Sequence, residues 1–257
     1  KGAGNRMKEE CIANGGLVSE YNWLPYFDPC KAARYCQMKE KMEQYTWEEI
    51  VTYVNIGVDH AFYTNSKQID NPDCLTVLVN KYHPLPKDYI PKDLEQIHPE
   101  FNANELVLRR EAAKALEEMG RAAREEGILL QAVSAFRSFE YQEEVYFRFK
   151  TPDSSMEEYQ KERDKVSARP GYSEHQTGLA VDINDLEETF ELTPAGIWLA
   201  ANSYYFGYIL RYPKGKEAVT GYSYEPWHFR YIGRKYAKKV HASGITFDEY
   251  ATRYLPF

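Results

Sequence analysis

The sequence lacks an excess of basic residues. Its 32 lysines and arginines are outnumbered by 39 aspartates and glutamates, which gives a formal net charge of −7. A nucleic-acid-binding protein usually carries a positive patch or stripe that neutralises phosphates, and no basic stripe is present here. We therefore expect no nucleic-acid partner.

Long apolar runs are also missing. No segment has the roughly 20 consecutive apolar residues that a membrane-spanning helix needs. The first ten residues, KGAGNRMKEE, contain no apolar core of a signal peptide. Two interpretations stay open: a cytosolic protein, or an exported one whose leader or membrane anchor lies outside this sequence.

Cysteine is scarce and is not spaced for metal binding. The four cysteines, Cys11, Cys30, Cys36 and Cys74, form no C-x-x-C pair, so we do not expect a thiolate zinc site. An even number allows two disulfides in three connectivities, which would require an oxidising compartment. The alternative is that the cysteines are buried free thiols.

Apolar and aromatic residues are abundant. Hydrophobic residues make up 43% and aromatic residues 15% of the 257 positions, and 22 residues are tyrosine. This is enough for one large domain, or for one domain with a smaller appendage. Tyrosine favours sheets and half-polar grooves, so its abundance favours a β-containing fold with a polar cleft.

Capping signals and hydrophobic spacing predict a mixed order of helices and short strands. Helices are expected over 46–57, over 102–126, after Ser138, after 154–157 and over 193–207. Strands are expected over 75–79, 128–135, 179–183, 209–212 and 227–231. The order shows no regular β-α-β rhythm, which favours an α+β fold with an antiparallel sheet flanked by helices. We divide the chain into a helical N-terminal extension, 1–72, and a main domain, 73–257.

Two of the predicted strands carry ionisable residues on the face opposite the core. Their alternation places one set of apolar residues inward: Leu179, Val181 and Ile183 in one strand, Trp227, Phe229 and Tyr231 in the other. The opposite faces present Asp182 in the first strand, and His228 with Arg230 in the second. His175 reaches the same region from the turn that precedes the first strand.

Two histidines and an aspartate form a donor set that suits zinc, and three protein ligands leave a fourth position for water. Zinc lowers the pKa of such a water to roughly 7. Glu225 is the candidate base, because a bend at Pro226 can bring it round to His228. Each signal is weak alone, since a lone histidine is usually structural and a polar-face aspartate is usually solvated. The combination carries the hypothesis.

Four separated segments resemble the VanY-type zinc D-alanyl-D-alanine carboxypeptidases. They are S173-x-H175-x-x-G178-x-A180-x-D182, E225-x-W227-H228, S134-A-F-R137-S-F-E-Y-Q142 and L210-R-Y-P-K-G-K216. The resemblance covers roughly residues 74–235. It implies the α+β fold of the D-Ala-D-Ala peptidases, which is also seen in hedgehog signalling domains, with the helical extension outside it.

The resemblance also implies roles for individual residues. His175, Asp182 and His228 would bind Zn²⁺, Glu225 would be the general base, and Arg137 would face the scissile carbonyl. Contacts to the terminal part of the substrate are implied for four neutral hydrogen-bonding residues: Gln142, Ser173, Tyr212 and Ser138. Structural alternatives are a strand-end salt bridge for Arg137, a helix surface position for Gln142, a core edge for Tyr212 and a helix N-cap for Ser138.

A zinc-dependent D,D-carboxypeptidase is the function that the resemblance implies, with a peptidoglycan stem peptide ending in D-alanine as substrate. The first alternative is an L,D-carboxypeptidase acting on tetrapeptide stems, and the second is a non-catalytic module that retains zinc for binding. Intact Glu225 and Arg137 argue against the module, which needs neither. The substrate implies a bacterial enzyme outside the cell membrane and associated with the cell envelope. The sequence gives no indication of the oligomeric state.

Overall fold

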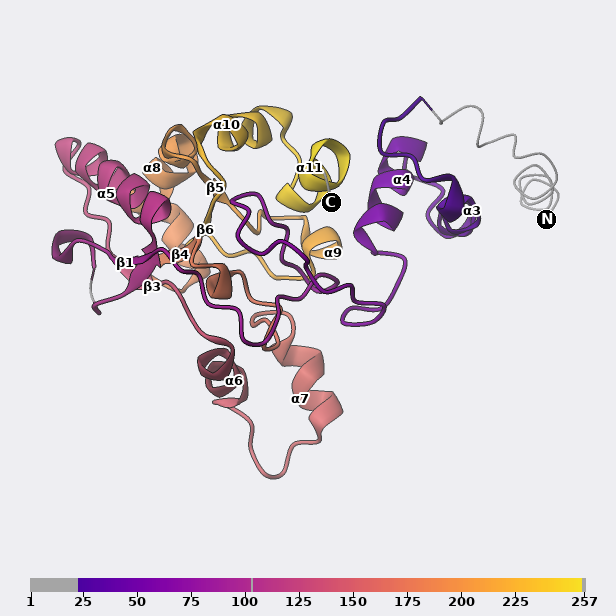
Figure 1. The fold of residues 1–257 in the computed structure, drawn as a ribbon, viewed down its shortest axis with the longest axis horizontal. Helices are drawn as coiled ribbons and strands as arrows, with labels where there is room; N and C mark the ends of the chain where they lie inside the picture. Colours follow the sequence, from indigo (N-terminus) through magenta and orange to yellow (C-terminus); the bar gives the residue numbers. More distant parts are fainter. Residues whose placement is uncertain (1–22, 103, 256–257) are drawn as a thin grey trace. The chain divides into compact units, whose positions relative to one another are not determined.

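The computed structural model describes residues 23–102 and 104–255, which group into two compact units (Figure 1). The larger unit spans residues 65–247 and contains every predicted site residue. The smaller unit combines residues up to 64 with those from 248 onward. The sequence-based division into 1–72 and 73–257 stays a prediction about domains.

The described part of the smaller unit is helical. It contains the short 3-10 helix η1 (Pro29–Lys31), α3 (Ala32–Lys41), α4 (Trp47–Ile56) and nearly all of α11 (Phe247–Tyr254). The predicted capping box starts α4: the Thr46 hydroxyl accepts from the Glu49 N–H at 3.3 Å, and the Glu49 carboxylate accepts from the Thr46 N–H at 2.7 Å. Gly57 ends α4 with a φ of 107°, a conformation that favours glycine.

The cysteines of the described residues do not share one state. Cys36 is disulfide-bonded, whereas Cys30 and Cys74 are free and exposed. Cys30 and Cys74 are therefore free thiols, as one alternative predicts, but the prediction that such thiols are buried is wrong for both. Cys11 lies outside the described residues.

A four-stranded antiparallel sheet forms the centre of the larger unit. Its strand order is β3 (Ala132–Ser134), β4 (Ala180–Ile183), β6 (His228–Tyr231) and β5 (Tyr208–Leu210). A separate pair, β1 (Leu94–Gln96) and β2 (Val107–Arg109), is also antiparallel. The predicted α+β class with an antiparallel sheet is confirmed.

Helices cover the apolar side of this sheet. The largest is α5 (Arg110–Glu125), and its buried residues, including Leu116 and Met119, pack in one core with Val181 and Phe229 of the central strands. Further helical segments of this unit are η2 (Pro99–Phe101), η4 (Glu188–Leu192), α8 (Pro194–Asn202), η5 (Ser203–Phe206), α9 (Glu217–Thr220) and α10 (Arg234–Ser243). Apolar burial on this side leaves the opposite side of the sheet for polar residues.

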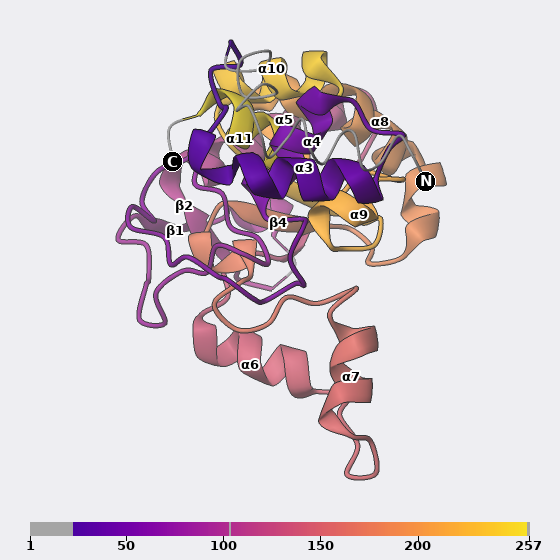
Figure 2. The same cartoon turned by 90° about the vertical axis from the view of Figure 1, so that its right-hand side faces the viewer.

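Figure 2 shows α6 (Phe139–Phe147) and α7 (Met156–Arg163) extending from the rest of the larger unit as a pair. Each helix begins at a serine cap: Ser138 accepts from the Tyr141 N–H, and Ser155 forms a capping box with Glu158. The chain then returns through residues 164–173 to η3 (Glu174–Thr177), which immediately precedes β4. The two helices α6 and α7 therefore directly precede η3 and β4, which carry two of the predicted metal ligands, in the sequence.

The predicted strand over residues 75–79 is not formed. A hydrogen bond from the Val77 N–H to the Cys74 carbonyl (3.1 Å) closes a turn. The Val77 carbonyl, which a neighbouring strand would use, instead accepts from Nη2 of Arg230 at 2.8 Å. Val77 and Val79 are buried, so the apolar run does mark a core segment. Its backbone is paired by a side chain rather than by another strand.

The predicted helix start at 102–105 is also wrong. Residues Val107–Arg109 are the strand β2, and α5 begins only at Arg110. Instead of capping a helix, Asn102 donates from Nδ2 to the carbonyls of Ile97 and Leu106, both at 3.1 Å, and accepts from the Leu106 N–H at 2.9 Å. Its side chain closes the loop between β1 and β2.

The remaining strand predictions are longer than the observed strands, and one of them also begins a residue too late. Only Ala132–Ser134 of 128–135 is a strand, and 209–212 corresponds to Tyr208–Leu210. The helix expected over 193–207 is present as α8 followed by η5, with Gly207 at its end. Among the described residues, no helix has the length and apolar character needed to cross a bilayer.

Candidate active site

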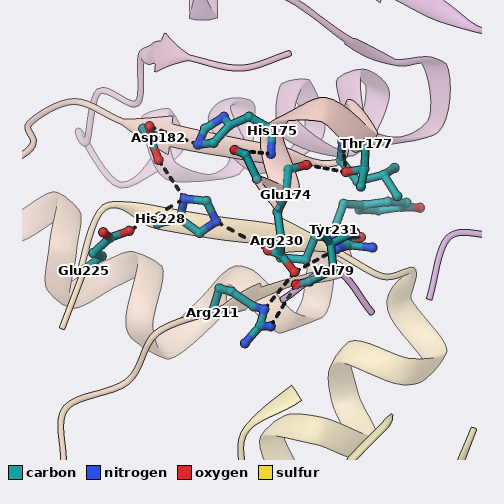
Figure 3. A network of polar contacts seen from close by, with 12 residues as sticks. Val79, Glu174, His175, Thr177, Asp182, Arg211, Glu225, His228, Arg230 and Tyr231 are labelled. Carbon is teal, nitrogen blue, oxygen red and sulfur yellow. Dashed lines mark hydrogen bonds and ion pairs between the residues drawn. The ribbon is translucent and has the colours of Figure 1, made fainter. Parts of the chain in front are cut away.

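The three predicted metal ligands converge on the polar side of the central sheet (Figure 3). The distance from His175 Nε2 to Asp182 Oδ2 is 3.3 Å, and that from His228 Nδ1 to Asp182 Oδ1 is 2.9 Å. All three side chains are buried, and their ligand atoms lie within 4.8 Å of one another. It is the one such group found among the described residues, and it can hold a metal ion.

Strand register explains why two of these side chains meet. Asp182 in β4 is directly opposite His228 in β6, so both side chains project from the same face of neighbouring strands. His175 comes from η3, where the Ser173 hydroxyl accepts from its N–H at 3.3 Å. Gly178 then turns the chain into β4 with a φ of 66°, which is why a glycine suits this position.

Each histidine has one ring nitrogen engaged away from the cluster. His175 Nδ1 is 2.6 Å from the Ala135 carbonyl, so it donates there and Nε2 faces Asp182. His228 Nε2 is 3.4 Å from Glu174 Oε2, and Nδ1 faces Asp182. Two imidazole nitrogens and a carboxylate are therefore directed at one point, and this donor set fits zinc.

The two imidazoles differ in charge preference. Burial lowers the pKa of His175 to about 4, so its ring is neutral and can act as a ligand. Burial also opposes charge on His228, but hydrogen bonds to Asp182 and Glu174 outweigh burial and raise the pKa of His228 to about 9. Binding of a metal at Nδ1 of His228 must therefore displace a proton.

Glu225 lies beside this cluster, as the sequence predicts. A hydrogen bond from the His228 N–H to the Glu225 carbonyl (3.2 Å) closes a turn at Pro226, which places Glu225 Oε2 3.9 Å from His228 Nδ1. Burial raises the pKa of Glu225 to about 7, although His228 opposes the change. A carboxyl group with a pKa close to neutrality can both take up and release a proton.

Arg137 is a partly buried arginine that contacts the backbone of His175. Its N–H donates to the His175 carbonyl at 3.2 Å, and its buried Nε makes no hydrogen bond. Burial lowers the pKa of Arg137, while the charges of Asp182 and Glu225 favour its ionised form. A buried guanidinium nitrogen without a partner is costly, and it suits an oxygen that becomes negative during a reaction.

The four predicted substrate contacts differ in their surroundings. Gln142 is buried, which excludes the helix surface position; its Nε2 donates to the Ala168 carbonyl at 2.8 Å, and its Oε1 makes no hydrogen bond. The centroid of the Tyr212 ring lies 4.9 Å from that of the His228 ring. Ser138 and Ser173 cap α6 and η3. Contact with substrate stays a prediction for all four.

A buried acidic residue at the site was missed by the sequence analysis. Glu174 Oε1 accepts from Arg211 Nε and from Arg230 Nη1, each at 2.8 Å. Burial alone would raise the pKa of Glu174, but the two guanidiniums hold it far below the ordinary value. Two signals were available in the sequence. Glu174 directly precedes His175, and Arg230 lies on the same face of the predicted strand as His228.

Residues 105–234 match the family described as VanY, D-alanyl-D-alanine carboxypeptidase. A D-alanyl-D-alanine carboxypeptidase of Enterococcus faecalis is 34% identical over 198 residues, covering 75% of this chain and 71% of that protein. The matched family segment contains the three predicted metal ligands and the predicted base, Glu225.

Solved structures show the same relationship. The LdcB LD-carboxypeptidase is 40% identical to this chain with a TM-score of 0.67. The match covers 74% of this chain and 91% of the LdcB chain. A mutant of the D,D-pentapeptidase VanY from a VanB-type vancomycin-resistance cassette, in complex with Zn(II), is 35% identical with a TM-score of 0.58, covering 68% and 97%. VanYB in complex with D-alanine-D-alanine is 34% identical with a TM-score of 0.59, covering 70% and 98%.

Proposed function

The chain belongs to the VanY family of D-alanyl-D-alanine carboxypeptidases, and we propose that it removes the C-terminal D-alanine from peptidoglycan stem peptides. Its cofactor is zinc, and we assign His175, Asp182 and His228 as the ligands. The observation that carries the proposal is their buried convergence, with Glu225 Oε2 3.9 Å from His228 Nδ1. The VanYB complex with D-alanine-D-alanine supports a substrate that ends in D-alanine.

Zinc, when bound, supplies a Lewis acid and lowers the pKa of water. Glu225 takes a proton from the attacking water and returns it to the nitrogen of the departing D-alanine. Arg137 donates to the carbonyl oxygen of the bond that breaks, because negative charge accumulates there as the water adds. Burial strengthens both interactions by excluding competing water.

We propose that Gln142, Ser173, Tyr212 and Ser138 contribute to holding the terminal part of the peptide. Gln142 has the strongest support, since its buried Oε1 makes no hydrogen bond and can accept one from a substrate amide. Ser138 has the weakest support, because its hydroxyl already accepts from the Tyr141 N–H at 3.2 Å.

D,D-carboxypeptidase action is the proposed specificity, and the description of the matched family supports it. L,D-carboxypeptidase action is the second candidate, because the LdcB LD-carboxypeptidase is 40% identical to this chain. The two reactions use the same metal site and differ in the residue that precedes the terminal D-alanine. Peptidoglycan stem peptides are built into the wall outside the bacterial membrane, and we therefore propose that the enzyme is located at the cell envelope.

Mass spectrometry of purified muropeptides after incubation with the zinc-loaded protein tests the proposal. Loss of one D-alanine from pentapeptide but not from tetrapeptide supports D,D specificity, and the reverse result supports L,D specificity. A zinc-loaded protein that releases D-alanine from neither peptide would contradict the carboxypeptidase proposal and favour the non-catalytic binding module.

A further inference from the structure

A cluster of three charged residues lies behind His228, on the side away from the predicted metal position (Figure 3). Glu174, Arg211 and Arg230 are each at most 2% exposed. We propose that Glu174 is a positioning residue that holds His228 with Nδ1 directed at the metal, and that the two arginines hold Glu174 in place. This inference rests on the zinc site of the proposed function, and not on the choice of substrate.

The contact between Glu174 and His228 determines which ring nitrogen is available. Glu174 Oε2 is 3.4 Å from His228 Nε2, and an ionised carboxylate can only accept a hydrogen bond. Nε2 must therefore carry the hydrogen, which leaves the lone pair of the neutral ring on Nδ1. Nδ1 is the atom that faces Asp182 Oδ1, at 2.9 Å.

The two carboxylate oxygens of Glu174 have separate partners. Oε1 receives both guanidiniums, from Arg211 Nε and Arg230 Nη1, each at 2.8 Å. Oε2 therefore remains directed at His228. This division fixes the rotation of the carboxylate and, through it, the plane of the imidazole.

The arginines are themselves anchored to the backbone. Arg230 Nη2 donates to the carbonyls of Leu75 (3.1 Å) and Val77 (2.8 Å), and Arg211 Nη2 donates to that of Val79 (3.5 Å). Both guanidiniums also lie near the ring of Phe247, with distances to its centroid of 5.5 Å and 5.6 Å. The cluster therefore links the segment 75–79 to the central sheet.

Stability alone is a weak reason for such a cluster. Taking three charges out of water carries a large desolvation cost, and well-packed apolar residues often stabilise a fold equally well. A carboxylate that orients a metal-ligating histidine gives the cluster a purpose that apolar residues cannot fulfil. His175 needs no such residue, because a backbone carbonyl, that of Ala135, accepts from its Nδ1 at 2.6 Å.

Glu174→Gln is the informative substitution. The two arginines only donate hydrogen bonds, so the amide oxygen of the new side chain must face them. Its NH₂ group then faces His228 Nε2, where two donors oppose each other and the metal-binding form of the ring is disfavoured. We expect the zinc Kd to rise 10- to 100-fold, the range found for such orienting partners.

Competition with a chromophoric chelator measures this Kd, at a temperature at which circular dichroism shows the variant folded. A second measurement is the ¹⁵N-edited spectrum of the zinc-saturated protein, in which the proton on His228 Nε2 should shift once its carboxylate acceptor is gone. The shift of this proton reports that the contact is lost, whereas a merely structural role for Glu174 would leave the zinc Kd of the folded variant unchanged. An unchanged zinc Kd in the folded variant would overturn the proposal.

Asp164→Asn is the matched control. Asp164 also accepts from an arginine (Arg169 Nη2 to Oδ2, 2.8 Å) and from the Tyr146 hydroxyl (2.7 Å), but it contacts no metal ligand. The same change from acid to amide should lower stability there and leave the zinc Kd unchanged. A Kd that rises equally in the control would mean that general loosening explains the effect, and the proposal would fail.

Glu174→Asp decides the question if the glutamine variant does not fold. Aspartate keeps the negative charge between the arginines, but it is one methylene shorter and cannot contact them and His228 equally well. We expect a folded protein with weaker zinc binding, and wild-type affinity would overturn the proposal. Wild-type protein that binds zinc but releases no D-alanine would instead contradict the proposed function and leave this inference standing.

Discussion

Asp182 lies directly opposite His228 across strands β4 and β6, with Oδ1 2.9 Å from Nδ1. Both side chains are buried, so neither group can be satisfied by bulk water. Burial would raise the pKa of Asp182, but His175 and His228 hold it well below the ordinary value. The carboxylate is therefore ionised at neutral pH and able to bind a metal without first losing a proton.

Removal of zinc is expected to destabilise the protein. A ligand that binds only the folded state stabilises it by RT ln(1 + [L]/Kd), which is about 4 kcal/mol at 1,000 times the Kd. Thermal unfolding should therefore occur at a lower temperature after dialysis against a chelator, and added zinc should restore the original Tm. If chelation left the Tm of a protein with analytically confirmed zinc loss unchanged, the assignment of a tightly bound zinc would be wrong.

Replacement of Glu225 should separate catalysis from metal binding. Glu225→Gln keeps the size and polarity of the side chain but removes the group that accepts the proton, so kcat should fall by roughly 10²- to 10⁴-fold. Zinc content per chain, measured by atomic absorption, should stay the same, because the three ligands are intact. Near-normal turnover by the glutamine variant would show that another group is the base.

Arg137→Met should reduce activity without reducing stability. The buried Nε of Arg137 makes no hydrogen bond, and burial lowers its pKa, so the folded state accommodates this cation at a cost. Loss of a donor to the developing negative oxygen should lower kcat by about 10²- to 10³-fold. Urea unfolding of the metal-free variant should give equal or higher stability, and a clear loss would support the alternative role of Arg137 as a structural ion-pair partner.

Strand alternation predicted two of the three candidate metal ligands, Asp182 and His228, from the sequence. Asp182 and His228 each stand between apolar neighbours in a short strand, and this pattern gives the face of each side chain without any knowledge of the fold. Pairing of the two strands then follows from sheet formation. The spacing of Glu225 from His228 and the bend at Pro226 suggested the base, and the resemblance to a known family added what these patterns could not, namely a role for Arg137.

Contacts between side chains far apart in the sequence explain the features that could not be predicted from it. Glu174 meets Arg211 and Arg230 across 37 and 56 residues of sequence, and no local pattern indicates such partners. The predicted strand at 75–79 failed for the same reason, since its carbonyls accept from these arginines. The sequence predicts a helix cap at Asn102, because helix capping and loop closure use the same kinds of side-chain hydrogen bond. Only the positions of Ile97 and Leu106 in the folded chain show that Asn102 closes a loop instead.

Lys81 is expected to make stability depend on pH in the alkaline range. Its side chain is buried, and burial lowers the pKa of Lys81 to about 8, although the charge of Asp164 opposes the change. The ordinary lysine pKa of about 10.4 applies in the unfolded chain. Between these two values the unfolded state binds more protons than the folded state, so stability should rise with pH from about 8 to 10.4.

Lys81→Met removes the titrating group and retains an unbranched apolar side chain over the Tyr222 ring, where Nζ now lies 4.3 Å from the centroid. Urea unfolding of both metal-free proteins at several pH values measures the effect. In the wild type the free energy of unfolding should rise by up to about 3 kcal/mol over this pH range, since each pKa unit is worth about 1.4 kcal/mol, and in the variant this rise should be absent.

Tyrosines also affect stability at high pH. Burial raises the pKa of tyrosines such as Tyr146, which lowers the stability of both proteins above about pH 10, so the two proteins are compared at each pH. Parallel stability curves from pH 7 to 10 would show that Lys81 stays protonated in the fold, stabilised by its hydrogen bond to the Asp164 carbonyl.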